Sequence, residues 1–383
     1  LNVIINSSIA YLNVGTTITA NKVTVQAQTI YSNGLINAQS TSTLGAAIQL
    51  LAQAIYVSGG LTTSANTNSN TNNTTNTSVT YNGNVIRKED LPTFLTAQNN
   101  ATTALDVVYS SIAANDSSAN AQSNQNNQTN VIYLNAVSDL TLYSSAQILA
   151  NGTTGGHVTL SAHQFNAQSG SLIQANGNNG PGGNFNLQAT QLSIAGSVQA
   201  NGNTGGTITA AATSNNLQSG SLIQANGNNG PGGAITLQTV NNQVINNATV
   251  QANGTGNGGN IQISTTQSDI NLQSAIIQTN GSNGRGGQIG IAATNYTSLE
   301  SSVVEATGYT QGGTIKVGND AQTNTLPFSI FTNLDANSII KANQTNLANT
   351  TGGGFIETSG QTINLLSSIN AGRGGMWLID PNN

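Results

Sequence analysis

Residues 168–183 read QSGSLIQANGNNGPGG, and residues 218–233 repeat the same sixteen letters. The repeated unit contains an aliphatic, a polar and a small residue in succession, followed by an Asn-Gly turn and a Gly-Gly pair. Looser forms of this unit occur nine times between residues 148 and 371, in steps of 25, 25, 25, 27, 27, 27, 36 and 29 residues. A sequence period of this size is typical of a solenoid, in which each repeat stacks on the next.

The alternation inside each unit predicts a strand with one buried and one solvent-facing side. The aliphatic and small positions share a face, because alternate residues of a strand point to opposite sides. The aliphatic positions are Ile148, Ile173, Val198, Ile223, Val250, Ile277, Val304, Ile340 and Ile369. The residue after each of them is polar in all repeats but the first, as a solvent face requires: Leu149, Gln174, Gln199, Gln224, Gln251, Gln278, Glu305, Lys341 and Asn370.

A second alternating segment follows each Gly-Gly pair, for example with Phe185 and Leu187 or with Ile235 and Leu237 at its inward positions. A third, looser segment follows in most repeats. Two or three short strands per turn of about 25 residues, without a helical pattern between them, are the signature of stacked β-coils. The sequence therefore predicts an all-β protein, a single-stranded parallel β-helix solenoid of the pectate-lyase-like architecture.

One continuous solenoid domain is expected, with one large interruption. Residues 1–65 and 131–383 fit β-helix coils, whereas residues 66–130 are rich in Asn, Thr and Ser and predict a polar lateral excursion or insertion. The 36-residue step predicts a second insertion within residues 318–336, where Pro327, Phe328 and Phe331 are expected to cover an edge of the core. The chain begins in mid-strand and stops as abruptly, so we expect both ends to lie inside a longer protein.

Composition narrows the possible functions. Only 5% of the residues are charged, and the formal net charge is −5. Seven basic residues spread over 383 positions form no basic stripe that could neutralise phosphates, so nucleic-acid binding is not expected. The chain has no cysteine, which excludes disulfides and thiolate metal sites. His157 and His163 have no third ligand candidate near them in sequence, and no metal or other cofactor is expected.

Catalysis is considered because β-helices also host polysaccharide lyases and hydrolases. Such sites need carboxylates clustered on one outer face. The twelve acidic residues are scattered along the chain, and no catalytic constellation is found, so the chain is not expected to be an enzyme. Glu305 and Lys341 occupy equivalent outward positions on successive coils and predict an exposed ion pair.

The largest interruption holds the candidate adhesive surface. Loops on a rigid scaffold can vary without disturbing the core, so recognition is expected there rather than on near-identical coils. Its members are the densest charge cluster of the chain and two aromatic residues that a glycan or protein could stack against: Arg87, Lys88, Glu89, Asp90, Phe94 and Tyr109. A passive polar insertion is the alternative interpretation of the same segment.

The C-terminal segment carries a family resemblance. Residues 352–360, GGGFIETSG, and residues 371–383, AGRGGMWLIDPNN, resemble the GGFxETSG and GGxWLxDPNN segments of filamentous haemagglutinin-like adhesins. These are exoproteins of the two-partner secretion pathway of Gram-negative bacteria. The resemblance covers residues 131–383 well, residues 1–65 by pattern alone, and residues 66–130 not at all. The Asn-Pro-Asn motifs of that family's secretion domain are missing, so the chain resembles part of the repeat shaft.

The resemblance implies a right-handed β-helix, a secreted or cell-surface location and a role in cell adhesion. It also implies an outer-membrane transporter as partner, through a region outside this chain, and a glycan or protein on host or bacterial cells as receptor, with self-association possible. Two alternatives stay open: the shaft of a contact-dependent inhibition toxin exoprotein, and a carbohydrate-active β-helix enzyme. Trp377 is the single tryptophan, and its register predicts a place in the core.

Overall fold

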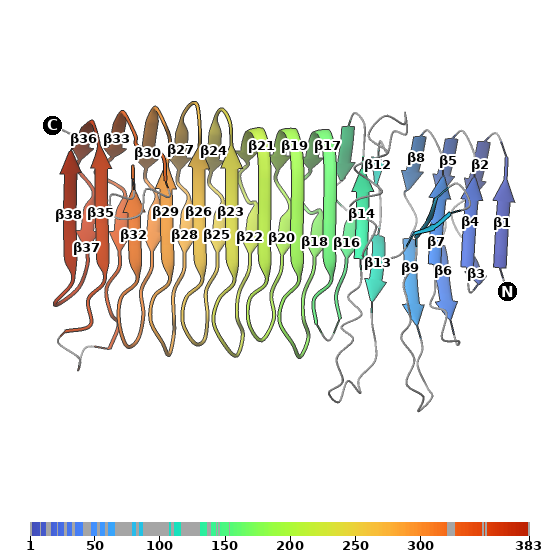
Figure 1. Ribbon diagram of the computed structural model, residues 1–383, viewed down its shortest axis with the longest axis horizontal. Helices are drawn as coiled ribbons and strands as arrows, with labels where there is room; N and C mark the ends of the chain where they lie inside the picture. The colour runs from blue at the N-terminus through green and yellow to red at the C-terminus, as the bar shows by residue number, and fades with distance from the viewer. Residues whose placement is uncertain are drawn as a thin grey trace.

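The computed structural model describes residues 146–381, except 153, 320–325, 347, 349 and 350; before residue 146 it describes mainly the backbone of the strands. Every regular element in this part of the chain is a β-strand, and the coils stack along one long axis (Figure 1). The predicted all-β parallel solenoid is thereby confirmed. Among the described residues no helix is long and apolar enough to cross a bilayer.

One sheet of thirteen parallel strands runs along the axis and contains the repeated unit. Its members, in spatial order, are β3 (Thr17–Ala20), β6 (Leu35–Ser40), β9 (Gly60–Ala65), β13 (Ser111–Asn115), β16 (Gln147–Leu149), β18 (Leu172–Gln174), β20 (Ser197–Gln199), β22 (Leu222–Gln224), β25 (Thr249–Gln251), β28 (Ile276–Gln278), β31 (Val303–Glu305), β34 (Ile339–Lys341) and β37 (Ser368–Asn370). Each strand of the repeats pairs in register with the equivalent strand of the next coil, for example Ile223 with Val250.

A second column of strands follows the Gly-Gly turns. It contains β14 (Val131–Asn135), β17 (His157–Ala167), β19 (Asn184–Ile194), β21 (Thr207–Leu217), β23 (Ala234–Thr239), β26 (Asn260–Thr265), β29 (Gln288–Ala292), β32 (Thr314–Val317), β35 (Phe355–Gly360) and β38 (Met376–Pro381). β14 pairs in register with β17, so residues 131–135 belong to the coils.

The third column completes each coil. It contains β2 (Ile9–Leu12), β5 (Thr29–Ser32), β8 (Ala54–Val57), β12 (Val107–Val108), β15 (Asp139–Leu142), β24 (Gln243–Asn246), β27 (Ile270–Gln273), β30 (Tyr296–Glu300), β33 (Phe331–Leu334) and β36 (Thr362–Leu365). The long strands β17, β19 and β21 belong to both columns, because β17 pairs with β14 and β15, and β21 pairs with β23 and β24.

The N-terminal region has a sheet of its own besides these columns. Strands β1 (Asn2–Asn6), β4 (Lys22–Gln26) and β7 (Ala47–Leu51) pair in parallel, whereas β10 (Val79–Tyr81) and β11 (Asn84–Ile86) form an antiparallel pair. Two strands inside the predicted excursion correct its extent. β12 pairs with β8 and β15, and β13 pairs with β9 and β16, so residues 107–108 and 111–115 belong to solenoid sheets.

The second insertion was predicted to lie within residues 318–336, and part of that range is regular solenoid. β33 lies inside that range, yet it pairs with β30 and β36 as a regular strand. Leu326 packs on the outer face instead, where a Cβ added to Gly290 would meet its Cδ1 atom at 3.0 Å. Phe331 faces outward as well, with its ring centroid 5.8 Å from that of Tyr296 in an edge-to-face arrangement. The insertion therefore covers an outer face of the coils.

The predicted apolar columns form the core. The side chains of Ile148, Ile173, Val198, Ile223, Val250, Ile277, Val304 and Ile340 are at most 1% exposed. The inward residues of the second column of strands are buried beside them, from Val158 and Leu160 to Ile315 and Val317. Since no coil could bury these faces alone, stacking supplies most of the hydrophobic stabilisation.

The Gly-Gly pairs are explained by close contact between coils. A Cβ atom on Gly182 would collide with the carbonyl oxygen of Ala200 in the next coil. The neighbouring Gly183 donates its N–H to the carbonyl of Ala175 at 2.7 Å and so closes the turn. A side chain at either position would push two coils apart, which is why the pair recurs with the period of the fold.

Trp377 occupies the expected register but is not buried. It pairs with Ile356, whose column is inward-facing, and its Nε1 donates to Thr358 Oγ1 at 3.2 Å. Its side chain is nevertheless 41% exposed, because no described strand stacks on the outer edge of β38. Trp377 therefore has the inward register that the sequence predicts, on a strand that pairs on one side only among the described residues.

We predict that Ile223→Asp lowers the free energy of unfolding by about 3–5 kcal/mol, because it puts an unpaired carboxylate into a dry column. The matched control is Gln238→Asp, at an exposed outward position of the second column of strands. That control should cost about 1 kcal/mol or less. Urea denaturation followed by circular dichroism measures both. Equal losses would contradict the register.

Candidate interaction surface

The outward side of the thirteen-stranded sheet carries a ladder of glutamine side chains. The Nε2 of Gln174 donates to Oε1 of Gln199 at 2.9 Å, and Gln224 donates to Gln251 at 3.1 Å. Gln251 continues to Gln278 at 2.9 Å. The ladder is interrupted once, where Gln199 donates to Ser197 of its own strand instead. All the inter-coil bonds run in one direction, so the carboxamide dipoles align along the axis.

A second ladder of asparagines lies two residues further along each coil. The backbone N–H of Asn201 donates to Oδ1 of Asn176 at 2.8 Å, and the N–H of Asn226 donates to Oδ1 of Asn201 at 2.8 Å. The same bond joins Asn151 with Asn176, Asn226 with Asn253, Asn253 with Asn280, and Asn280 with Thr307. The side-chain amides of Asn151 and Asn201 also donate to the glutamines Gln174 and Gln224. The two ladders therefore form one network of half-buried amides.

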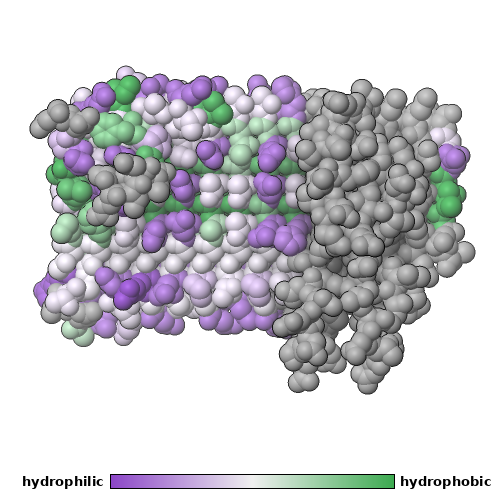
Figure 2. Space-filling view, viewed as in Figure 1, coloured by the Kyte–Doolittle hydropathy of each residue, from purple (hydrophilic) through white to green (hydrophobic). Residues whose placement is uncertain are grey.

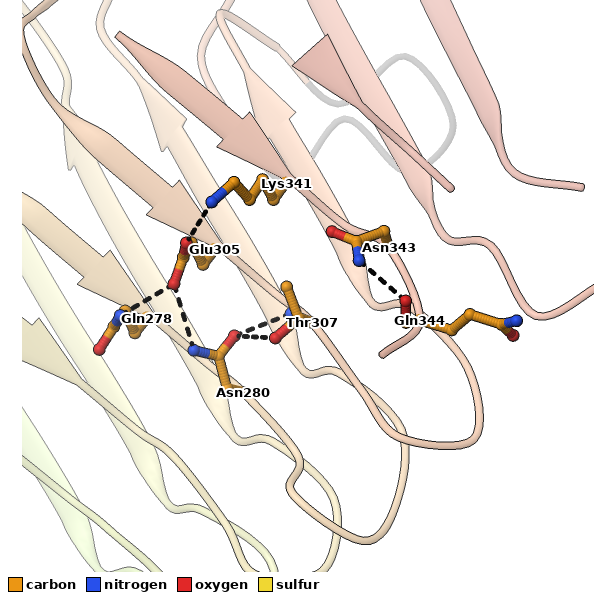
Figure 3. A network of polar contacts seen from close by, with 7 residues as sticks. All are labelled: Gln278, Asn280, Glu305, Thr307, Lys341, Asn343 and Gln344. Carbon is orange, nitrogen blue, oxygen red and sulfur yellow. Dashed lines mark hydrogen bonds and ion pairs between the residues drawn. The ribbon is translucent and has the colours of Figure 1, made fainter. Parts of the chain in front are cut away.

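Glu305 ends the glutamine ladder (Figure 3). Its carboxylate accepts hydrogen bonds from Gln278 Nε2 at 2.9 Å and Asn280 Nδ2 at 3.5 Å. It also lies 3.2 Å from Nζ of Lys341, with which it forms the ion pair that the sequence predicts. The Glu305 side chain is only 17% exposed, so the pair is less open than expected. A carboxylate fits here because it receives the last donor of the ladder and a cation from the next coil.

Sequence reasoning missed a second charged pair on the outer face of the second column. Glu357 is fully buried, and its Oε2 lies 3.9 Å from Nζ of Lys316, which is 12% exposed. Its Oε1 accepts a hydrogen bond from Ser359 Oγ at 3.0 Å. The signal was present in the sequence, because Lys316 and Glu357 occupy equivalent positions on successive coils. The burial of both side chains could not be read from that spacing.

The described surface offers little to acid–base chemistry. A groove of about 360 Å³ lies where the long strands bend, and its lining holds no ionisable side chain: Ser161, Ala162, Gln188, Ala189, Ala211, Ala212 and Thr213. His157 and His163 both lie on β17. No group of three or more His, Asp or Glu residues within the described ranges could hold a metal ion.

The predicted adhesive residues lie outside the described residues. This holds for Arg87, Lys88, Glu89, Asp90, Phe94 and Tyr109. The described surface of the coils is of mixed hydropathy. Hydrophilic and near-neutral residues alternate with hydrophobic rows along the long axis (Figure 2). The candidate surface of the described chain is therefore the amide network and its neighbouring rows.

Comparison with known proteins gave one structural similarity. No protein-family model matches the chain, and no curated protein sequence matches it. The crystal structure of the HMW1 secretion domain from Haemophilus influenzae is similar with a TM-score of 0.49 and 14% sequence identity, over 99% of this chain and 93% of that chain. A similarity of this size carries no argument about function.

We predict that Glu305 and Lys341 are coupled through the end of the ladder. Glu305→Gln leaves an amide donor facing the Lys341 ammonium, and Lys341→Gln leaves the carboxylate without its cation. Each single change should cost about 0.5–1 kcal/mol, while the double change restores an amide ladder and should cost less than the sum. A double-mutant cycle by urea denaturation tests this. Strict additivity of the two losses would show that the residues act independently.

Proposed function

We propose that this chain is a structural and adhesive shaft segment of a large secreted bacterial surface exoprotein, which mediates attachment to cells or surfaces. The observation that carries the proposal is the in-register stacking of thirteen parallel strands in one sheet. At a strand spacing of about 4.8 Å, such a stack holds its ends about 60 Å apart. A rod of this kind can present a binding region at a distance from the membrane.

The surface chemistry supports a structural role over catalysis. The outward amides of the repeats are largely bonded to one another, so they stabilise the stack without leaving a cluster of reactive groups. Two ion pairs lie on the outer faces of the coils, Glu305–Lys341 and Lys316–Glu357. The groove at the strand bend has no acid or base to act on a glycan.

The family resemblance of residues 352–383 supports the location and the partners of this proposal. By this proposal, an outer-membrane transporter of the two-partner secretion pathway exports the protein and recognises a region outside this chain. A glycan or protein on a host or bacterial cell is the receptor. The shaft of a contact-dependent inhibition toxin exoprotein has the same architecture, and expression of the complete gene in a growth-competition assay separates the two.

Binding to cells is the direct test. The purified chain should bind to cultured epithelial or bacterial cells in a saturable way and should release no product from plant, fungal or bacterial polysaccharides. Measurable turnover of any such polysaccharide would overturn the non-enzymatic proposal. Binding that is absent from every cell type tested would limit the role to that of a spacer.

The location of the adhesive residues is tested by substitution. Replacing Arg87, Lys88, Glu89, Asp90, Phe94 and Tyr109 by serine should reduce cell binding at least roughly tenfold, because it removes both charge and aromatic surface. The matched control replaces the exposed shaft residues Gln191, Asn228 and Gln238 by serine. If the control lowers binding and the first variant does not, the shaft itself is adhesive.

A further inference from the structure

Asn-Gly pairs occur in two structural settings in the part of the chain that the structure describes. In peptides, the Gly nitrogen attacks the Asn side-chain carbon Cγ, a new C–N bond forms, and ammonia leaves. The resulting succinimide is opened by water to aspartate or isoaspartate. This reaction needs a free Gly N–H and a carboxamide that can rotate toward it, so hydrogen bonds to either group oppose it.

The first setting is the asparagine ladder, which restrains both groups. In Asn253–Gly254, the Asn Oδ1 accepts from Asn280 N at 2.7 Å, and the Gly N–H donates to the carbonyl of Asn280 at 2.9 Å. The same two bonds restrain the pairs that begin at Asn151, Asn176, Asn201, Asn226 and Asn280. The six glycines are buried. Asn257–Gly258 is restrained in the same way by the backbone of Arg285.

The second setting is the outer tip of the turns. Asn229 and Asn283 are exposed, and each is followed by glycine. The carbonyls of Gly230 and Gly284 accept bonds from the next coil, from Gly256 N and Thr310 N. Their own N–H groups, however, donate to no atom of the described residues.

The side-chain amides of Asn229 and Asn283 differ in their hydrogen bonds. The side chain of Asn283 has no hydrogen bond within the described chain, whereas Asn229 Nδ2 donates to Asn203 Oδ1 at 3.0 Å on the surface. That bond leaves Asn229 Oδ1 without the backbone donor that every ladder asparagine has.

We propose that Asn229 and Asn283 are sites of spontaneous deamidation, while the ladder asparagines of the same Asn-Gly sequence are protected by their inter-coil hydrogen bonds. Each event replaces a neutral amide by a carboxylate on the turn edge. At Asn283 the new charge arises two residues from the exposed Arg285. The isoaspartate product inserts a methylene into the main chain at the tip, so the ladder and the apolar columns stay intact.

The identical sequence of residues 168–183 and 218–233 provides an internal replicate. Asn179 is exposed like Asn229 and is also followed by glycine. It should therefore deamidate with Asn229, whereas Asn176 and Asn226, three residues earlier in the two copies, should not.

The experiment is incubation of the folded full chain in mildly alkaline buffer, followed by acid quenching and peptide mapping by mass spectrometry. Asn229 and Asn283 should convert at least roughly tenfold faster than Asn226 and Asn253, because the ladder pairs react only after local opening. In urea all of these pairs should convert at similar rates. The variants Asn229→Gln and Asn283→Gln should lose the signal at their own site and keep the melting temperature. Similar rates at tip and ladder pairs in the folded chain would overturn the proposal, as would faster conversion in the ladder.

Discussion

Each coil of this protein depends on its neighbours for its hydrogen bonds, because a parallel strand cannot pair with its own coil. In-register pairing is therefore the constraint on which the rest of the structure depends. It brings Ile223 between Val198 and Val250 and keeps all three dry. It also brings Gly182 so close to Ala200 that no side chain fits. Apolar columns and glycine pairs are two consequences of one stacking rule.

The same constraint organises the polar face. Because equivalent residues lie directly above one another, an amide on one coil meets an amide on the next, and each can donate and accept. A single carboxylate can end such a series only where a cation follows, as with Glu305 and Lys341. The low charge of the chain follows from this arrangement, since a column of like charges at this spacing would repel along its whole length.

A stack stabilised coil by coil is well suited to a rod. Its stability is shared among many near-identical contacts between neighbours. The insertion before β33 has a different character, because its residue Leu326 adds a side chain to the outer face without changing the columns. Leu326 over Gly290 shows that even a short insertion makes a contact that the repeats lack.

The sequence by itself determined the strands, their faces and their register. A period near 25 residues and strict alternation leave one way to bury Ile173 and expose Gln174, so the core columns and the Glu305–Lys341 pair could be predicted from spacing alone. Only the tertiary structure decided the contacts that segments outside the repeat make with the coils. That β12 and β13 join the solenoid and that Leu326 lies over Gly290 depend on contacts that do not recur from coil to coil. A periodic pattern specifies what a residue faces within its own repeat. The contacts of an insertion do not recur from coil to coil, so no periodic pattern in the sequence predicts them.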